Sequence, residues 1–436
     1  MNRGFHALVL VVGLALATPL QAQKFDDYGR GLAREMLRNI AEDVKKHYYD
    51  PKFHGIDFDA RVRAADEQLK HANSVTESYK IIASALDGLN DRETYFVPPY
   101  GGFLHDYGWQ MQMIGNHCYV TRVRPKSAAE DKGLKPGDEV LSVNGVTPSR
   151  ENFADLQYIL RLLSPQPELR VQLRDASGQE KKLVVPAKVE PSRFMASNVM
   201  AEAKTMDAEY GKQLEKNRPH CESLGPQAGV CKISWFRFNN GQLHDLLNFA
   251  KKHEALILDM RGVNDTDLII LRPLMGGFFD HDVTLGTRVS RDGSKTETIK
   301  SEHDSFTGKL VILLDSFSSY GAELFARTMQ LQKRATVIGD RSAGLVREQK
   351  SYHYNFTMSR GDIYWAHITD AEIIMADGQS LERKGITPDE VVLPKPADLA
   401  GENDPVLAHA AELVGVKLES DKAAKLFPFE WPDFSH

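Results

Sequence analysis

The sequence predicts a multidomain protein that combines α+β and α/β architecture. The chain has 436 residues, which is more than one ordinary domain needs. Apolar residues recur at helical spacing up to about residue 90, and short β-type segments separated by turns follow. Beyond residue 191, predicted strands and helices alternate, as in a mostly parallel α/β fold. We therefore expect a helical domain over 24–100, a β-rich domain over 104–190 and an α/β core over 191–436.

Residues 1–22 have the pattern of a cleaved export signal. Arg3 and His6 precede an apolar run from Ala7 to Ala17, and a small-residue cleavage site ends at Ala22. The run is too short to cross a bilayer, and no later run reaches that length. We therefore expect a periplasmic or secreted protein without a transmembrane anchor after signal removal.

Composition argues against several functional classes. The formal net charge is −6 and no basic stripe is present, so nothing favours binding to nucleic acid. No Cys/His spacing suggests a metal site, and no phosphate loop is found, so we expect neither metal nor cofactor. Cys221 and Cys231 flank a loop and could form a disulfide or remain thiols, with Cys118 left as a buried thiol.

The helical domain follows from two patterns. Leu32, Met36, Ile40 and Val44 share one face of a first helix, and a second helix begins near Phe58. Ser74 with Glu77 forms a possible capping box before a third helix. These patterns carry no chemistry of their own.

The β-rich domain contains a run, Ser127 to Gly145, that resembles the central part of PDZ domains. PDZ domains bind a peptide C-terminus by adding it as a strand to a sheet edge. The resemblance implies that the segment from Gly108 to Gly115 supplies the carboxylate loop and edge strand. A module that only packs against its neighbours is the alternative. The implied peptide-binding residues are Gly108, Trp109, Gln110 and Met111.

The α/β core contains the most informative segment of the chain. Leu310 to Leu314 form a predicted buried strand, Asp315 to Ser319 a short turn, and a helix starts near Gly321. Such a turn often carries a nucleophile beside the amide groups of a helix start. The segment resembles the nucleophile run of the C-terminal processing (tail-specific) serine peptidases. Glu323 fixes the register, and it places Tyr320 where that family has its nucleophilic Ser.

Tyr320 changes the expected chemistry. A phenol has a pKa near ~10 and is bulkier than a Ser hydroxyl, so we expect Tyr320 to fill the pocket rather than attack a carbonyl. Ser318 and Ser319 are the alternative nucleophiles. A shift of one position at a helix start rotates a side chain by roughly 100°, and Ser at such a position more often caps the helix.

Three further segments depart from the family pattern. In Leu256 to Thr266, the matching residues Asp259, Arg261 and Gly262 are kept, but Asp265 and Thr266 replace the paired glycines of the oxyanion loop. In Gly339 to Glu348, Leu345 stands where many members have a Lys base, although one branch lacks that Lys. In Leu89 to Pro99, Glu93 replaces a His; a desolvated carboxylate could still act as a base, but we expect a surface carboxylate.

The resemblance leads to three functional hypotheses. The first is an exported tail-specific peptidase homologue that binds peptides or protein C-termini, with hydrolysis lost or weak. The second is a working serine endopeptidase that uses Ser318 or Ser319. The third is a structural envelope protein. The sequence gives no oligomeric state.

Overall fold

The computed structural model describes residues 25–99, 103–191, 218–234, 236, 239–264, 268–302, 304–355 and 363–431. The predicted signal peptide at 1–22 lies outside these residues, as do Asp265 and Thr266 of the oxyanion loop. Within the described ranges, none of the helices combines the length and apolar character that a membrane span requires.

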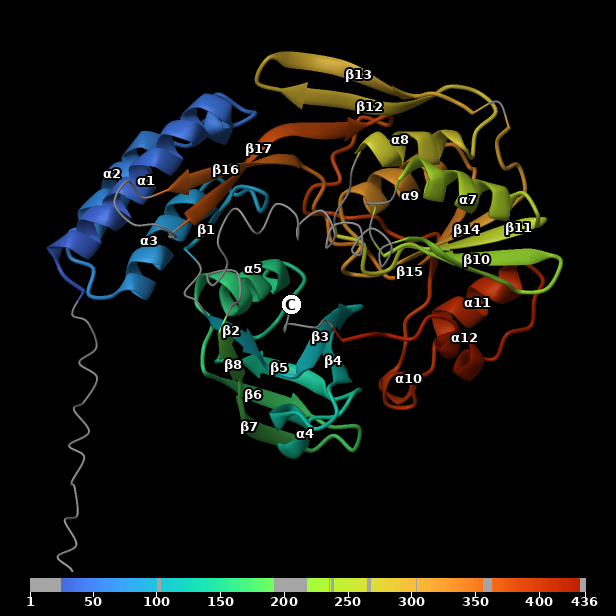
Figure 1. The fold of residues 1–436 in the computed structure, drawn as a ribbon, viewed down its shortest axis with the longest axis horizontal. Coiled ribbons are helices and arrows are strands. Elements are labelled where there is room, and N and C mark those ends of the chain that lie inside the picture. The colour runs from blue at the N-terminus through green and yellow to red at the C-terminus, as the bar shows by residue number, and fades with distance from the viewer. Residues whose placement is uncertain are drawn as a thin grey trace, which may run out of the picture.

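The N-terminal helices α1 (Asp27–His47), α2 (Phe58–Leu69) and α3 (Val75–Asp87) pack side by side (Figure 1). Ser74 caps α3 by accepting the Glu77 N–H, but Glu77 accepts the N–H of Asn73 rather than that of Ser74. The predicted capping box is therefore only half formed.

The apolar core of these helices continues into strands from much later in the chain. It includes Tyr364, Ala366 and Ile368 from strand β17 (Ile363–Met375). β17 also pairs antiparallel with β1 (Tyr95–Val97), which follows α3. The turn between α3 and β1, which carries Glu93, is held against the core by these contacts.

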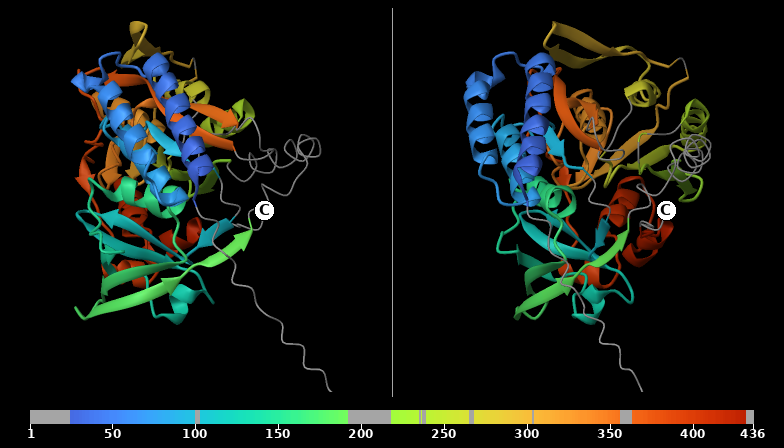
Figure 2. Two further views of the ribbon diagram at one scale, coloured as in Figure 1. Left: turned by 90° about the vertical axis from the view of Figure 1, so that its left-hand side faces the viewer. Right: turned by 60° about the vertical axis from the view of Figure 1, so that its left-hand side comes forward.

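The β-rich region forms a five-stranded antiparallel sheet in sequential order. Its first strand, β3, is at the edge. Helix α5 (Phe153–Tyr158) and the π-helical turn after it (Ile159–Leu163) lie between β5 and β6. Figure 2 shows this sheet as a separate layer of the molecule. The strands are β3 (Trp109–Ile114), β4 (His117–Val123), β5 (Glu139–Val143), β6 (Glu168–Arg174) and β7 (Glu180–Pro186).

The α/β core is built on a six-stranded sheet in the order β18-β15-β14-β11-β10-β9, parallel except for β9. Side chains of the buried strand β11 alternate between the two faces: Leu256 and Leu258 face one apolar cluster, and Ala255 and Ile257 the other. Helices α7 (Asn240–Ala250), α8 (Leu268–Gly276) and α9 (Gly321–Leu331) cover the first face, and α11 (Pro405–Leu413) and α12 (Ser420–Leu426) the second. The strands are β9 (His220–Ser223), β10 (Ala228–Lys232), β11 (Ala255–Asp259), β14 (Lys309–Leu314), β15 (Thr336–Gly339) and β18 (Glu390–Val391).

The structure contains a further sheet, of five strands, that the sequence did not predict. It joins β1 and β17 to β12 (Val283–Ser290), β13 (Gly293–Ile299) and β16 (Glu348–Asn355). This sheet connects the N-terminal helices to the α/β core (Figure 1).

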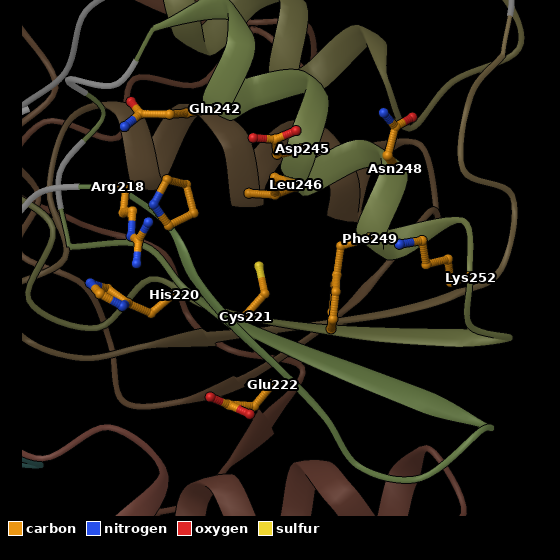
Figure 3. A pocket seen from close by; sticks show the side chains of 11 residues that line it. Arg218, His220, Cys221, Glu222, Gln242, Asp245, Leu246, Asn248, Phe249 and Lys252 are labelled. Atoms are coloured by element: carbon orange, nitrogen blue, oxygen red, sulfur yellow. The ribbon is translucent and has the colours of Figure 1, made fainter. Parts of the chain in front are cut away.

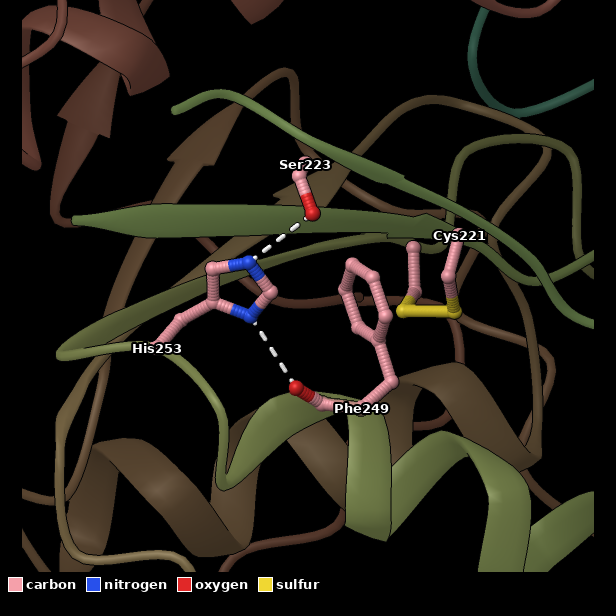
Figure 4. The surroundings of a disulfide bond; sticks show 5 residues. Cys221, Ser223, Phe249 and His253 are labelled. Atoms are coloured by element: carbon pink, nitrogen blue, oxygen red, sulfur yellow. Dashed lines mark hydrogen bonds between the residues drawn. A yellow bond between two sulfur atoms is a disulfide. The ribbon is translucent and has the colours of Figure 1, made fainter. Parts of the chain in front are cut away.

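The structure decides between a disulfide and free thiols. Cys221 on β9 and Cys231 on β10 lie directly opposite each other and form a disulfide (Figure 4). Cys118 is buried and unpaired, as expected.

Candidate active site

The turn after β14 gives Tyr320 an unusual backbone conformation. Tyr320 is the N-cap residue of α9, with φ +41° and ψ −99°. A positive φ is uncommon for a bulky side chain and persists only where the surroundings enforce it. The Tyr320 N–H donates to the Leu345 carbonyl over 2.8 Å and to Glu323 Oε2 over 3.1 Å. The strand–turn–helix arrangement expected from the sequence is thus present, with Tyr320 at its apex.

Glu323 holds this turn against the loop that follows β15. Its buried carboxylate accepts hydrogen bonds from Ser342 Oγ at 2.5 Å, Gly344 N at 2.7 Å and Leu345 N at 3.0 Å, besides that from Tyr320. Burial raises the pKa of Glu323 to about 7, although these donors favour the ionised form. Glu323 therefore positions the backbone rather than facing a substrate.

The Tyr320 side chain is poorly suited to nucleophilic attack. It is half-buried and packs against the apolar cluster under α9. Burial, with Glu348 and Asp370 adding negative charge nearby, raises the pKa of its phenol well above the usual value. The phenol therefore stays protonated at physiological pH.

Ser318 is held in the turn by its side chain, and Ser319 by its backbone N–H. Ser318 is fully buried, and its Oγ lies 3.0 Å from Asp315 N and 3.0 Å from the carbonyl oxygen of Met260. Ser319 is 4% exposed, and its N–H donates to the Val263 carbonyl. The expectation that these serines cap the helix is wrong, because Tyr320 occupies the N-cap position.

Gly262 and Arg261, which were expected at the oxyanion loop, form hydrogen bonds within the protein. Gly262 has φ +80°, and its N–H donates to Asp315 Oδ1 over 2.9 Å. The Arg261 guanidinium binds Asp259 and Asp404, at 2.7 Å in each case. Burial opposes the charge on Asp259, but Arg261 and Lys232 outweigh it and lower the pKa of that carboxyl. Arg261 thus stabilises the end of β11, and the Gly262 amide is already occupied.

Glu93 is not the surface carboxylate expected from the sequence. It is half-buried. Its pKa is raised to about 8, mostly by burial and in part by the nearby carboxylates of Glu382, Asp91 and Glu323. Packing of the α3–β1 turn against the core partly shields Glu93 from water. This contact joins residues far apart in the sequence, so no local pattern predicts it.

Sequence reasoning missed Glu382 and Arg347, which belong to the same site. Glu382 is 8% exposed, and one of its oxygens accepts the Val346 N–H over 3.2 Å. Arg347 lies 3.5 Å from a carboxylate oxygen of Asp91 and 3.6 Å from one of Glu372. Each follows one apolar residue and precedes a charged one, Arg383 and Glu348 respectively, so the local sequence gives no signal of a site.

The predicted peptide-binding segment forms the start of the edge strand, and some of its backbone groups already have hydrogen-bond partners. Gly108 donates its N–H to Asp106 Oδ1, and its carbonyl accepts the Arg124 N–H, so the Gly108 amide itself is already paired. Trp109 and Met111 are buried, and Gln110 is half-buried. This segment is therefore the edge strand that the resemblance implies, with its first amide occupied.

The second half of β3 docks onto the turn that carries Tyr320. Gln112 Nε2 donates to Asp315 Oδ2 at 2.8 Å, and Ser316 Oγ donates to the Met113 carbonyl at 2.6 Å. The ring of Phe317 packs into the apolar core of the β-rich domain, with its centroid 5.9 Å from that of Phe153. The two sites predicted separately from the sequence are thus in direct contact.

Two other features do not belong to this site. A cavity of about 570 Å³ lies between β9 and α7, and no predicted site residue lines it (Figure 3). Beside it, Ser223 Oγ lies 3.0 Å from His253 Nε2, and His253 Nδ1 lies 3.0 Å from the Phe249 carbonyl (Figure 4). The neighbouring amides of Leu224 and Glu254 both donate to backbone carbonyls, so they offer no oxyanion donor to this pair.

Comparison with known proteins decides the family. Residues 227–392 match the model of peptidase family S41, and residues 119–174 match a PDZ domain. The chain carries an S41 peptidase domain and a PDZ domain. The predicted tail-specific peptidase resemblance and the fold class are confirmed. The turn around Tyr320 belongs to the S41 domain, and β3 contributes the edge of the PDZ sheet.

The chain is similar to several bacterial proteases over part of its length. It is 23% identical over 333 residues to a probable CtpA-like serine protease of Staphylococcus haemolyticus, which covers 71% of this chain and 60% of that protein. It is 22% identical over 298 residues to the tail-specific protease of Haemophilus influenzae, covering 66% and 40% of the two chains. This S41 chain thus spans less than two thirds of the length of these relatives.

Solved structures share the fold. Mature CPAF complexed with lactacystin aligns with a TM-score of 0.63 at 15% identity, covering 85% of this chain and 95% of CPAF. The photosystem II D1 C-terminal processing protease aligns with a TM-score of 0.51 at 17% identity, covering 91% and 99%. At this identity the likeness concerns the fold of the S41 and PDZ domains, and not their activity.

Proposed function

We propose that this chain is an exported S41 homologue that binds peptides or protein C-termini and has lost most or all hydrolytic activity. One observation carries the proposal: Tyr320 occupies the apex of the turn after β14, where the family resemblance places the attacking Ser. Its phenol is held protonated, and its backbone is fixed by Leu345 and Glu323. Export rests on the signal pattern of residues 1–22.

The neighbouring groups support the loss of hydrolysis. Acyl transfer needs a nucleophile, a base and donors aimed at the developing oxyanion. Ser318 is buried in hydrogen bonds of its own, and the Gly262 amide is bound to Asp315. Glu93 stands in place of the family His, and its raised pKa leaves it largely protonated near neutral pH.

Peptide binding is supported by the edge position of β3 in the PDZ sheet. The turn from Asp315 to Phe317 already contacts Gln112 and Met113. A peptide can therefore pair with the segment from Trp109 to Met111 and must displace this turn to extend further. Binding at the PDZ edge and movement of the Tyr320 turn are coupled in this arrangement.

Two measurements test the proposal. Titration with a peptide bearing either a free or an amidated C-terminus is expected to show tighter binding of the free carboxylate. Incubation with unfolded casein is expected to give no cleavage above that of a Ser318→Ala, Ser319→Ala double variant. Equal and negligible affinity for both peptides would remove the binding claim. Cleavage that disappears in the double variant would instead show a working peptidase.

A further inference from the structure

The chain beyond α12 leaves the α/β core and continues onto the PDZ domain. We call the segment Phe427–Trp431 the strap. Helix α12 ends at Leu426, and Pro428 prevents it from continuing. Phe427 is half-buried against the apolar cluster that α11 and α12 cover. One end of the strap is therefore fixed to the core.

Two aromatic rings of the strap lie over two arginines of the PDZ domain. The Phe429 ring centroid is 4.0 Å from Cζ of Arg122, and the Trp431 ring centroid is 4.8 Å from Cζ of Arg124. The two rings also contact each other edge to face, with centroids 5.3 Å apart. In each pair the residues are two positions apart, and such residues share one face of an extended chain. The strap and the end of β4 thus match in spacing, and guanidinium groups are attracted to aromatic faces.

Arg124 connects the strap to the start of the peptide-binding segment. Its guanidinium forms an ion pair with Asp106, the last residue of β2 (Phe103–Asp106). The Arg124 and Asp106 side chains are 26% and 13% exposed, so this pair is largely shielded from water. The other oxygen of Asp106, Oδ1, accepts the Gly108 N–H over 2.9 Å. A line of contacts therefore runs from Trp431 through Arg124 and Asp106 to the Gly108 amide.

Asp106 binds the Gly108 amide in the way that the end of a bound peptide would. PDZ domains hold a peptide C-terminus through backbone N–H groups that bind its carboxylate. The PDZ resemblance assigns this role to the segment that begins at Gly108. In the free protein, the Gly108 N–H already binds a carboxylate of the chain itself. An incoming carboxylate has to displace Asp106, and the two negative charges repel each other while both are near the amide.

We propose that the strap keeps the peptide-binding edge of the PDZ domain closed. Trp431 holds Arg124 against Asp106, and Arg124 in turn keeps the Asp106 carboxylate on the Gly108 amide. This inference rests on the proposed peptide-binding function and adds a way to regulate it. Because coupling between two equilibria is reciprocal, a bound C-terminus loosens the strap by the factor by which the strap weakens binding.

The first experiment measures affinity for an octapeptide of Ser, Ala and Val residues with a free C-terminus, by calorimetry on the full chain at pH 7. Trp431→Ala removes one cation–π contact and is expected to bind the peptide about threefold tighter. Adding Phe429→Ala, which removes the second contact, is expected to bring the gain to about tenfold. Tyr28→Ala is the matched control. Its ring is 66% exposed on α1, and the affinity should not change.

Asp106→Ala tests whether the strap acts through Asp106. This variant leaves the Gly108 amide open to a peptide, and we expect it to bind about tenfold tighter than the unaltered chain. Mutations that act through one shared group are not additive. Trp431→Ala is therefore expected to add nothing in the Asp106→Ala background. The same threefold gain in both backgrounds would overturn the link between the strap and Asp106.

The second experiment detects release of the strap itself. Chymotrypsin cuts after aromatic residues but not before Pro, so within the strap it can cut only after Phe429. The octapeptide has no aromatic residue and survives the digestion. At saturation it is expected to raise the rate of this cut about threefold, measured by mass spectrometry, whereas its amidated form at the same concentration is not. An unchanged rate at saturation overturns the closure.

The outcomes separate closure from binding. Equal affinity of the unaltered chain and all variants for the peptide overturns the strap and leaves peptide binding intact. Absence of binding by the unaltered chain and by every variant overturns both proposals. Circular dichroism checks folding. Phe429 and Trp431 lie beyond the last helix and are not fully buried, so their variants are expected to fold even if Asp106→Ala does not.

Discussion

The backbone N–H of Gly262 donates to the carboxylate of Asp315 over 2.9 Å. Asp315 lies at the end of β14, and Gly262 follows β11, so this bond closes the space between the two strand ends. The same carboxylate accepts from Gln112 of the PDZ domain. One aspartate therefore links the PDZ edge, the turn of Tyr320 and the segment that the family resemblance identifies as the oxyanion loop.

Tyr320→Ser is expected to leave the protein inactive. The change restores a hydroxyl at the apex of the turn, but the Gly262 amide remains bound to Asp315. The sequence also places Asp265 and Thr266 where the family has paired glycines, and a carboxylate opposes a developing oxyanion. Cleavage of casein by the variant at the level of the unaltered protein supports this account. A gain of activity would show that only the nucleophile was missing.

Glu323→Gln is expected to destabilise the fold by about 1–3 kcal/mol. The side chain of Glu323 accepts four hydrogen bonds from donors, and a Gln amide offers one oxygen and an NH₂ group that faces donors. Urea denaturation gives the free energy of unfolding. The exposed Glu302→Gln is a matched control and should change it by less than about 0.5 kcal/mol. An equally small change in Glu323→Gln would contradict the positioning role.

Glu93→Gln is expected to become more stable relative to the unaltered protein as pH rises. The folded-state pKa of about 8 lies above the ordinary value of 4.5, so the folded protein binds the proton more tightly than the unfolded chain. The contribution of Glu93 to stability is therefore complete below about pH 4.5 and is lost as pH rises to about 8. Thermal melts of both proteins across this range measure the difference. A difference independent of pH would contradict the burial of Glu93.

Phe317→Ala is expected to loosen the PDZ domain from the core. The ring of Phe317 packs in the PDZ apolar core next to Phe153, and its loss is expected to cost about 1–3 kcal/mol. Because the turn also occupies the edge of β3, the variant should bind C-terminal peptides more tightly. Peptide titration and limited proteolysis of the domain junction measure the two effects. Unchanged affinity would show that the turn does not compete with the peptide.

Local patterns were sufficient to predict the centre of the site. The apolar run of β14 and the short turn predicted the strand–turn–helix element, and the family resemblance, with Glu323 fixing the register, implied Tyr320 at the nucleophile position. These features depend on neighbours in sequence, where periodicity and turn chemistry are informative.

Long-range contacts account for what was missed. Glu93 is half-buried by packing of the α3–β1 turn against the core, and Ser318 bonds to Met260 across a strand end. Strands such as β13 carry mostly exposed polar residues, so their alternation is weak in the sequence. No local pattern reports which carboxylates, Glu93 and Glu382 among them, meet in space.

The central claim is that this S41 homologue binds peptides without cleaving them. The most direct measurement is mass spectrometry of new N-termini after prolonged incubation of unfolded casein with the full chain at pH 7. The account predicts none beyond those formed with the Ser318→Ala, Ser319→Ala double variant. New termini that appear with the unaltered chain and vanish in the double variant would contradict it.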